Sequence, residues 1–122
     1  MKDRRYKEFY VPILNDEYAV YVHIGDRVKS NKAICKYLGK KEEFIDPQNR
    51  GKSVYCNGFH PCIWIDGTLG WKTATGTLAH EAIHAVSEIM NWLGMDIKDQ
   101  SGYEMLAHSV GAILRKCLPD YK

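Results

Sequence analysis

The sequence lacks any apolar run long enough to cross a membrane. Its first residues also lack the apolar core of a secretion signal. These two absences argue against a membrane-spanning protein and against an exported one. We therefore expect a cytoplasmic protein that has no membrane partner.

Cysteine is scarce as well, and no two cysteines form a C-x-x-C pair. The sequence holds Cys35, Cys56, Cys62 and Cys117. A structural zinc site built from cysteines is therefore not expected, and reduced, mostly buried thiols are the expected state in a cytoplasm. His60 and Cys62 lie close to Cys56 in the sequence, and these residues are a weaker, alternative metal-binding group.

An excess of charge of one sign is missing too. The 17 Lys and Arg residues nearly balance the 15 Asp and Glu residues, which leaves a formal net charge of +2. So small an excess does not predict a nucleic-acid partner. A hydrophobic fraction of 45% in 122 residues is typical of one globular domain with a single modest core. We therefore expect a single domain over residues 1–122.

One stretch carries recognisable chemistry: His80-Glu81-Ala82-Ile83-His84, an H-E-x-x-H motif. Residues four apart on a helix lie on the same face, so His80 and His84 can both bind one metal ion. Glu81 is rotated around the helix, beside the ion and off the chelating face. A carboxylate placed there can take a proton from water, and this combination is typical of zinc-dependent peptidases.

The surrounding sequence favours this interpretation over a chance match. A helix is expected from about Thr75 to Leu93, and Gly94 follows as a stop signal. We expect both histidines to border the buried face of this helix, where they would need a partner. The alternative is a pair of ordinary surface or core histidines. The apolar stripe of the helix comprises Leu78, Ala82, Ala85, Val86, Ile89 and Leu93.

The rest of the pattern predicts four strands and two further helices. Strands are expected at residues 9–14, 18–24, 53–56 and 62–66, and helices at residues 27–38 and 103–118. Asp26 is a candidate N-cap, Asn57-Gly58 is a hairpin signal, and Pro12 suggests an edge strand. Residues 67–76 are expected to form a loop. The fold class is therefore α+β, with a small, mostly antiparallel sheet packed on about three helices.

A catalytic zinc usually has a third protein ligand besides the two histidines of the motif. The last helix offers Glu104 and His108, which lie four apart and so share a face. Both residues also have ordinary explanations. Glu104 is a first-turn carboxylate favoured by the helix dipole, and His108 is a histidine hydrogen-bonded to a neighbour. The spacing does not choose between them.

The run from Thr77 to Ala85, then Gly94, then the run from Glu104 to Gly111 together resemble small phage-encoded zincin-like metallopeptidases of the gluzincin type. The resemblance implies a zincin-like active-site helix, a bound Zn2+ ion with His80, His84 and Glu104 as ligands, and Glu81 as general base. The position of His108 is commonly aromatic in that family, and Tyr103 stands where an acidic or amide residue is frequent. At that position His108 could polarise the substrate carbonyl, replace a ligand or have no catalytic role, and it is retained as a candidate catalytic group.

The expected function is therefore that of a zinc-dependent peptidase acting on a peptide or protein, in the cytoplasm of a bacterial host if the protein is phage-encoded. The resemblance also implies that the strand at residues 62–66 lines the cleft and pairs with an extended substrate, near Trp64 and Trp71. The alternative is a catalytically vestigial zinc-binding phage protein that acts through protein–protein interaction. The intact Glu81 favours the enzyme, because a structural site has no use for a general base.

Overall fold

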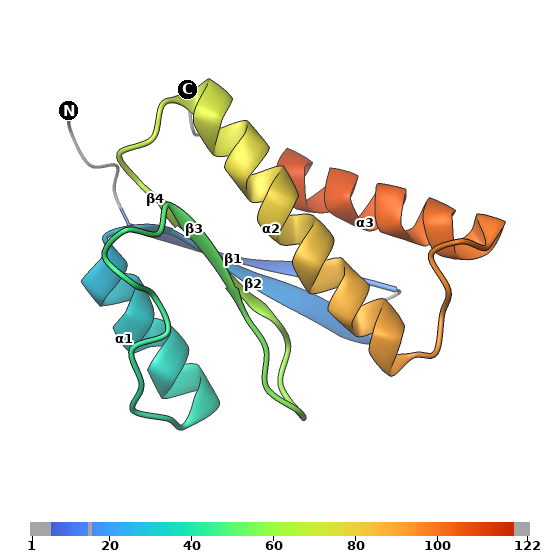
Figure 1. Ribbon diagram of the computed structural model, residues 1–122, viewed down its shortest axis with the longest axis horizontal. Helices are drawn as coiled ribbons and strands as arrows, with labels where there is room; N and C mark the ends of the chain where they lie inside the picture. The colour runs from blue at the N-terminus through green and yellow to red at the C-terminus, as the bar shows by residue number, and fades with distance from the viewer. Residues whose placement is uncertain (1–5, 15, 119–122) are drawn as a thin grey trace.

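The computed structural model describes residues 6–14 and 16–118, and it confirms the α+β class. A four-stranded sheet packs between three helices (Figure 1). The elements in chain order are β1 (Lys7–Ile13), β2 (Tyr18–Gly25), α1 (Arg27–Leu38), β3 (Gly51–Val54), β4 (Cys62–Asp66), α2 (Trp71–Trp92) and α3 (Gln100–Cys117).

The strands are arranged in the order β1-β2-β4-β3. The outer pairs, β1 with β2 and β3 with β4, are antiparallel, whereas the central pair of β2 and β4 is parallel. The expectation of a mostly antiparallel sheet is confirmed, but the sheet is mixed. A parallel pair needs a long crossover, which α1 and β3 supply here. This arrangement places β4 in the interior of the sheet and β3 at one edge. Strand β1, which contains Pro12, forms the other edge, as the proline predicted.

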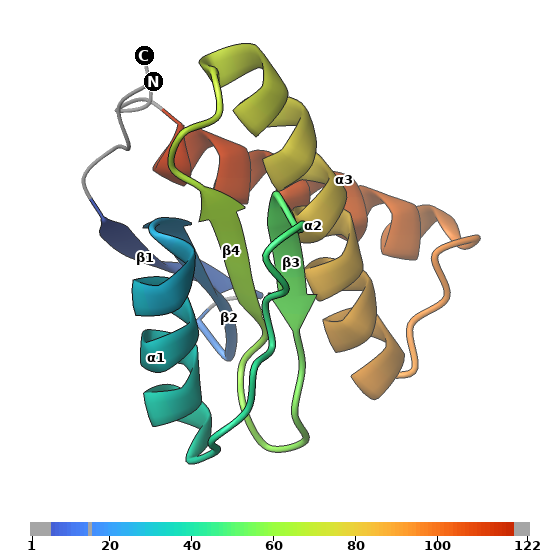
Figure 2. The same ribbon diagram turned by 60° about the vertical axis from the view of Figure 1, so that its left-hand side comes forward.

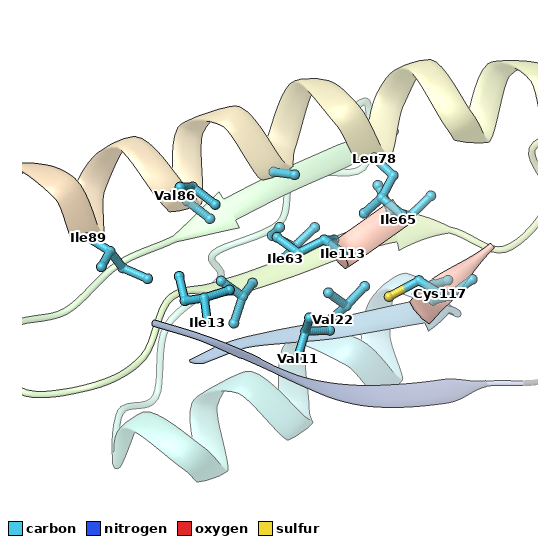
Figure 3. Close-up of a cluster of buried hydrophobic side chains, with 14 of the residues drawn as sticks. Val11, Ile13, Val22, Ile63, Ile65, Leu78, Val86, Ile89, Ile113 and Cys117 are labelled. Carbon is cyan, nitrogen blue, oxygen red and sulfur yellow. The ribbon is translucent and has the colours of Figure 1, made fainter. Parts of the chain in front are cut away.

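Each face of the sheet is covered by helices. Helices α2 and α3 cover one face and α1 covers the other (Figures 1 and 2). Successive side chains of a strand point to opposite faces, so Ile63 and Ile65 of β4 pack towards α2, while Cys62 and Trp64 pack towards α1. Figure 3 shows the larger core, in which side chains from the sheet meet Leu78, Val86 and Ile89 of α2 and Ile113 and Cys117 of α3.

The predicted bounds of α1 are confirmed, and so is its N-cap. The Asp26 carboxylate accepts a hydrogen bond from the backbone N–H of Lys29 at 2.8 Å. Gly94 also ends the motif helix as expected, because it adopts a left-handed φ of 69° that favours glycine. The hairpin predicted around Asn57-Gly58 is present, with its first strand shifted to Gly51–Val54.

Two helices begin earlier than their sequences predict. Helix α2 starts at Trp71, within the segment expected to be a loop, and it runs through Gly76. Glycine and threonine are poor helix formers, but Ala74 is fully buried in the core, and this packing overrides the local preference. Helix α3 starts at Gln100, so that Gly102 lies against the backbone of Asp96.

Within the described part of the chain, none of the helices combines the length and the apolar composition that a membrane crossing requires. All four cysteines have free thiols, and Cys62 and Cys117 are buried. Burial raises the pKa of each of these two thiols to about 12.

Candidate metal centre

The two motif histidines meet on α2. Their Nε2 atoms are 3.2 Å apart, and the ring planes are inclined at 74°. Both side chains are exposed, because the opposite side of the helix is buried against the sheet and α3. The expectation that both histidines border the buried face is therefore wrong, and burial gives no reason for their presence. Their convergence at an accessible surface is consistent with a ligand pair.

The spacing of these nitrogens fits a zinc ion. Zinc in proteins is tetrahedral with Zn–N distances of about 2.0–2.1 Å, so two histidine nitrogens on one ion lie about 3.3 Å apart. The observed 3.2 Å between Nε2 of His80 and Nε2 of His84 is close to that separation. Without an ion, one ring can donate its Nε2–H to the other. The same side-chain conformations therefore suit both situations.

The Glu81 side chain is turned towards β3. Its side chain is half-buried, and Ser53 of β3 is hydrogen-bonded to it. The Ser53 hydroxyl lies 2.8 Å from Glu81 Oε1 and 3.0 Å from the Glu81 backbone carbonyl oxygen. Glu81 therefore lies off the chelating face, as the motif predicts, and has a defined partner. Ser53 could not be identified from the sequence, because nothing in the sequence says which strand lies beside the motif helix.

Helix α2 and strand β3 approach each other closely at Gly51. A Cβ atom at this position would lie 2.6 Å from Thr77 Cγ2 and 3.3 Å from Glu81 Cγ. A side chain there would push the strand away from the helix. Glycine therefore permits the short separation at which Ser53, two residues further along the same face of β3, reaches Glu81.

The other two candidate residues lie together on α3. Nε2 of His108 is 3.5 Å from Oε2 of Glu104, and Gln100 donates a hydrogen bond to Oε1 of Glu104 at 3.1 Å. Both candidates are exposed. In both ribbon views the first turn of α3 extends past α2 (Figures 1 and 2). Neighbouring Tyr103 is also exposed, at 60% of its surface.

The structure thus brings the candidates together in two pairs. Over residues 6–14 and 16–118, no group of three or more His, Cys, Asp or Glu side chains could hold a metal ion as they stand. His80 and His84 form one pair, and Glu104 and His108 form the other. The assignment of Glu104 as the third ligand remains a prediction.

The weaker candidate group around His60 has a different environment. Nδ1 of His60 accepts a hydrogen bond from the backbone N–H of Ala19 at 3.3 Å, and its ring lies 6.0 Å from that of Tyr21. Cys62 is buried in the core next to α1. His60 is therefore part of an aromatic cluster at one end of the sheet.

The prediction that the strand at residues 62–66 pairs with the substrate is wrong. Strand β4 is hydrogen-bonded to β2 on one side and to β3 on the other, so neither of its edges is open to a peptide. Trp64 is buried on this strand, and its indole N–H donates to the Gly25 carbonyl oxygen at 2.9 Å. Its role is packing, whereas Trp71 is 46% exposed at the start of α2. The edge strand beside α2 is β3.

Comparison with known proteins adds no further assignment. The chain matches no protein-family model, no curated protein and no solved structure.

Proposed function

We propose that this protein is a zinc-dependent peptidase. The observation that carries the proposal is the convergence of His80 and His84 at 3.2 Å on an exposed helix face, with Glu81 one residue away and turned to the side. Two imidazoles at this spacing are suited to one zinc ion, and a carboxylate beside them is suited to proton transfer.

In this proposal His80 and His84 hold the ion together with Glu104, which α3 supplies. A zinc ion bound in this way polarises a substrate carbonyl and lowers the pKa of water. Because Glu104 belongs to a separate pair in the structure, its participation requires the first turn of α3 to approach α2. The proposal therefore requires this movement of α3, and zinc binding by Glu104 variants tests it.

Glu81 is the proposed general base. Its carboxylate takes a proton from the attacking water and returns it to the leaving amine, so the proton balance closes within one turnover. His108 lies one turn after Glu104 on the same exposed face of α3, and it is the proposed group that stabilises charge on the substrate oxygen. An extended peptide is proposed to pair with β3, the edge strand beside Glu81, in place of β4.

Metal analysis tests the first half of the proposal. Protein purified without chelator is expected to hold about one zinc per chain. His80→Ala should lose it, while His60→Ala serves as the matched control, since His60 lies in the aromatic cluster away from the motif. Equal zinc in the parent and in His80→Ala would rule out the metal centre.

A peptide-library assay tests the second half. The zinc-loaded parent is expected to cleave members of the library, and the Glu81→Gln variant is not. A protein that holds zinc but cleaves nothing above the Glu81→Gln background would instead support the alternative, a vestigial zinc-binding protein that acts through a protein partner.

A further inference from the structure

We propose that Ser53 of β3 is a positioning residue for Glu81, and that it holds the carboxylate in the orientation that proton transfer requires. This inference rests on the proposed function, because it assigns Ser53 a role in the same reaction. It concerns a residue outside the motif, on a different element, that no pattern in the sequence indicates.

The two contacts of Ser53 fix both ends of Glu81. The hydroxyl oxygen lies 3.0 Å from the Glu81 backbone carbonyl oxygen and 2.8 Å from Oε1 of the same residue. The first contact locates the hydroxyl relative to the helix backbone, and the second locates the carboxylate relative to the hydroxyl. A glutamate side chain is otherwise free to adopt many rotamers, so this arrangement removes conformational freedom before substrate binds.

Tyr55 directly follows β3 and lies two positions after Ser53. It lies near Ser53, and it is close enough to Glu81 and Glu88 for both carboxylates to act on its pKa. Burial raises the pKa of Tyr55, the nearby Ser53 hydroxyl acts in the opposite direction, and the two carboxylates add to the rise. Tyr55 therefore keeps its proton at neutral pH and adds no charge beside Glu81.

Gly51 sets the separation of the strand from the helix. A side chain at position 51 meets the Thr77 methyl group and Glu81 Cγ, as described above. The hydrogen bonds of Ser53 to Glu81 thus depend on the close approach at Gly51. Gly51→Ala is expected to displace Ser53 from Glu81. Adding Thr77→Ser, which removes the obstructing methyl group, is expected to restore the contact.

Kinetics on zinc-loaded protein test the role. Ser53→Ala is expected to lower kcat about 10- to 100-fold with little change in KM or zinc content, because misplacing the base affects the reaction and leaves substrate binding intact. Ser53→Thr keeps the hydroxyl and should recover most of the loss. Thr75→Ala is the control, since it removes a hydroxyl that is hydrogen-bonded to the Trp71 carbonyl oxygen within α2. A parental kcat in Ser53→Ala overturns the inference.

A double-mutant cycle on metal-free protein gives a readout that needs no activity. Ser53→Ala, Glu81→Ala and the double variant are compared by denaturant unfolding, and the paired contact predicts non-additive changes in stability. Additive changes overturn the inference. If the cycle is non-additive while the zinc-loaded parent cleaves no peptide, the contact exists but the proposed function fails, and the positioning role fails with it.

Discussion

Helices α2 and α3 carry the candidate residues under different constraints. On α2, the spacing of His80 and His84 follows from one helical turn, and Glu81 is held from the side by β3. On α3, Glu104 and His108 are exposed, and their contacts are with each other and with Gln100 of the same helix. The half of the site that lies within one helix is formed by local geometry, whereas the other half depends on how a second helix packs.

The largest expected effect on activity concerns Glu81, in the part of the site that lies on α2. Glu81→Gln should lower kcat by about 10²- to 10⁴-fold, because the amide cannot accept the proton, while zinc content stays at the parental value. Steady-state kinetics and metal analysis on the same preparations measure both quantities. Loss of zinc along with activity would show instead that Glu81 is needed to form the metal centre. Glu81 could then no longer be assigned as a base that is separate from the ligands.

A smaller effect is expected from substitutions on α3. These substitutions distinguish the roles of Glu104 and His108. Glu104→Ala should weaken zinc binding by more than the roughly 10- to 100-fold typical of losing a residue that only supports a ligand, whereas His108→Ala should leave the affinity near the parental value and mainly slow turnover. Competition with a zinc-binding dye gives the affinities. The opposite result would make the site a three-histidine centre and leave Glu104 as a neighbour of His108. Equal, unchanged affinities would mean that α3 supplies no ligand.

The smallest effect concerns His23, a buried histidine that contrasts with the exposed pair. Burial lowers its pKa from the ordinary value of 6.5, while the nearby Glu8 carboxylate acts in the opposite direction, and Tyr6 Oη lies 2.7 Å from its Nδ1. The folded protein keeps His23 neutral where the unfolded chain is protonated. The free energy of unfolding should therefore fall as the pH drops below about 6.5, because the unfolded state binds more protons.

Urea unfolding of metal-free protein at neutral and mildly acidic pH measures this dependence. His23→Gln should flatten it. His108→Ala controls for the loss of an imidazole from the surface. An unaltered slope in His23→Gln would assign the acid sensitivity to other groups.

Several parts of the structure could be predicted because their causes are local. Asp26 caps α1, and Gly94 ends α2 with a left-handed φ, since each depends on neighbours within a few residues. The start of α2 at Trp71 was missed, because the burial of Ala74 outweighs the weak helix propensity of the surrounding glycines and threonines.

The substrate strand was assigned wrongly for a related reason. Cys62 to Asp66 is close to the motif helix in sequence, but β4 lies between β2 and β3, so its backbone is paired on both sides. The apolar residues of β4 match this position, because an interior strand is buried on both faces. The parallel pairing of β2 with β4 joins residues some forty positions apart, which no local pattern specifies.

The sequence by itself determined the helical spacing of His80 and His84 and the displacement of Glu81 from their face, because an α-helix has the same geometry wherever it packs. Only the tertiary structure decided that β3 lies against this helix, that Gly51 allows the close approach, and that Ser53 meets Glu81. It also decided that the Glu104–His108 pair on α3 stays apart from the His80–His84 pair on α2. These contacts depend on strand order and on helix packing, which come from the burial of the whole apolar surface at once.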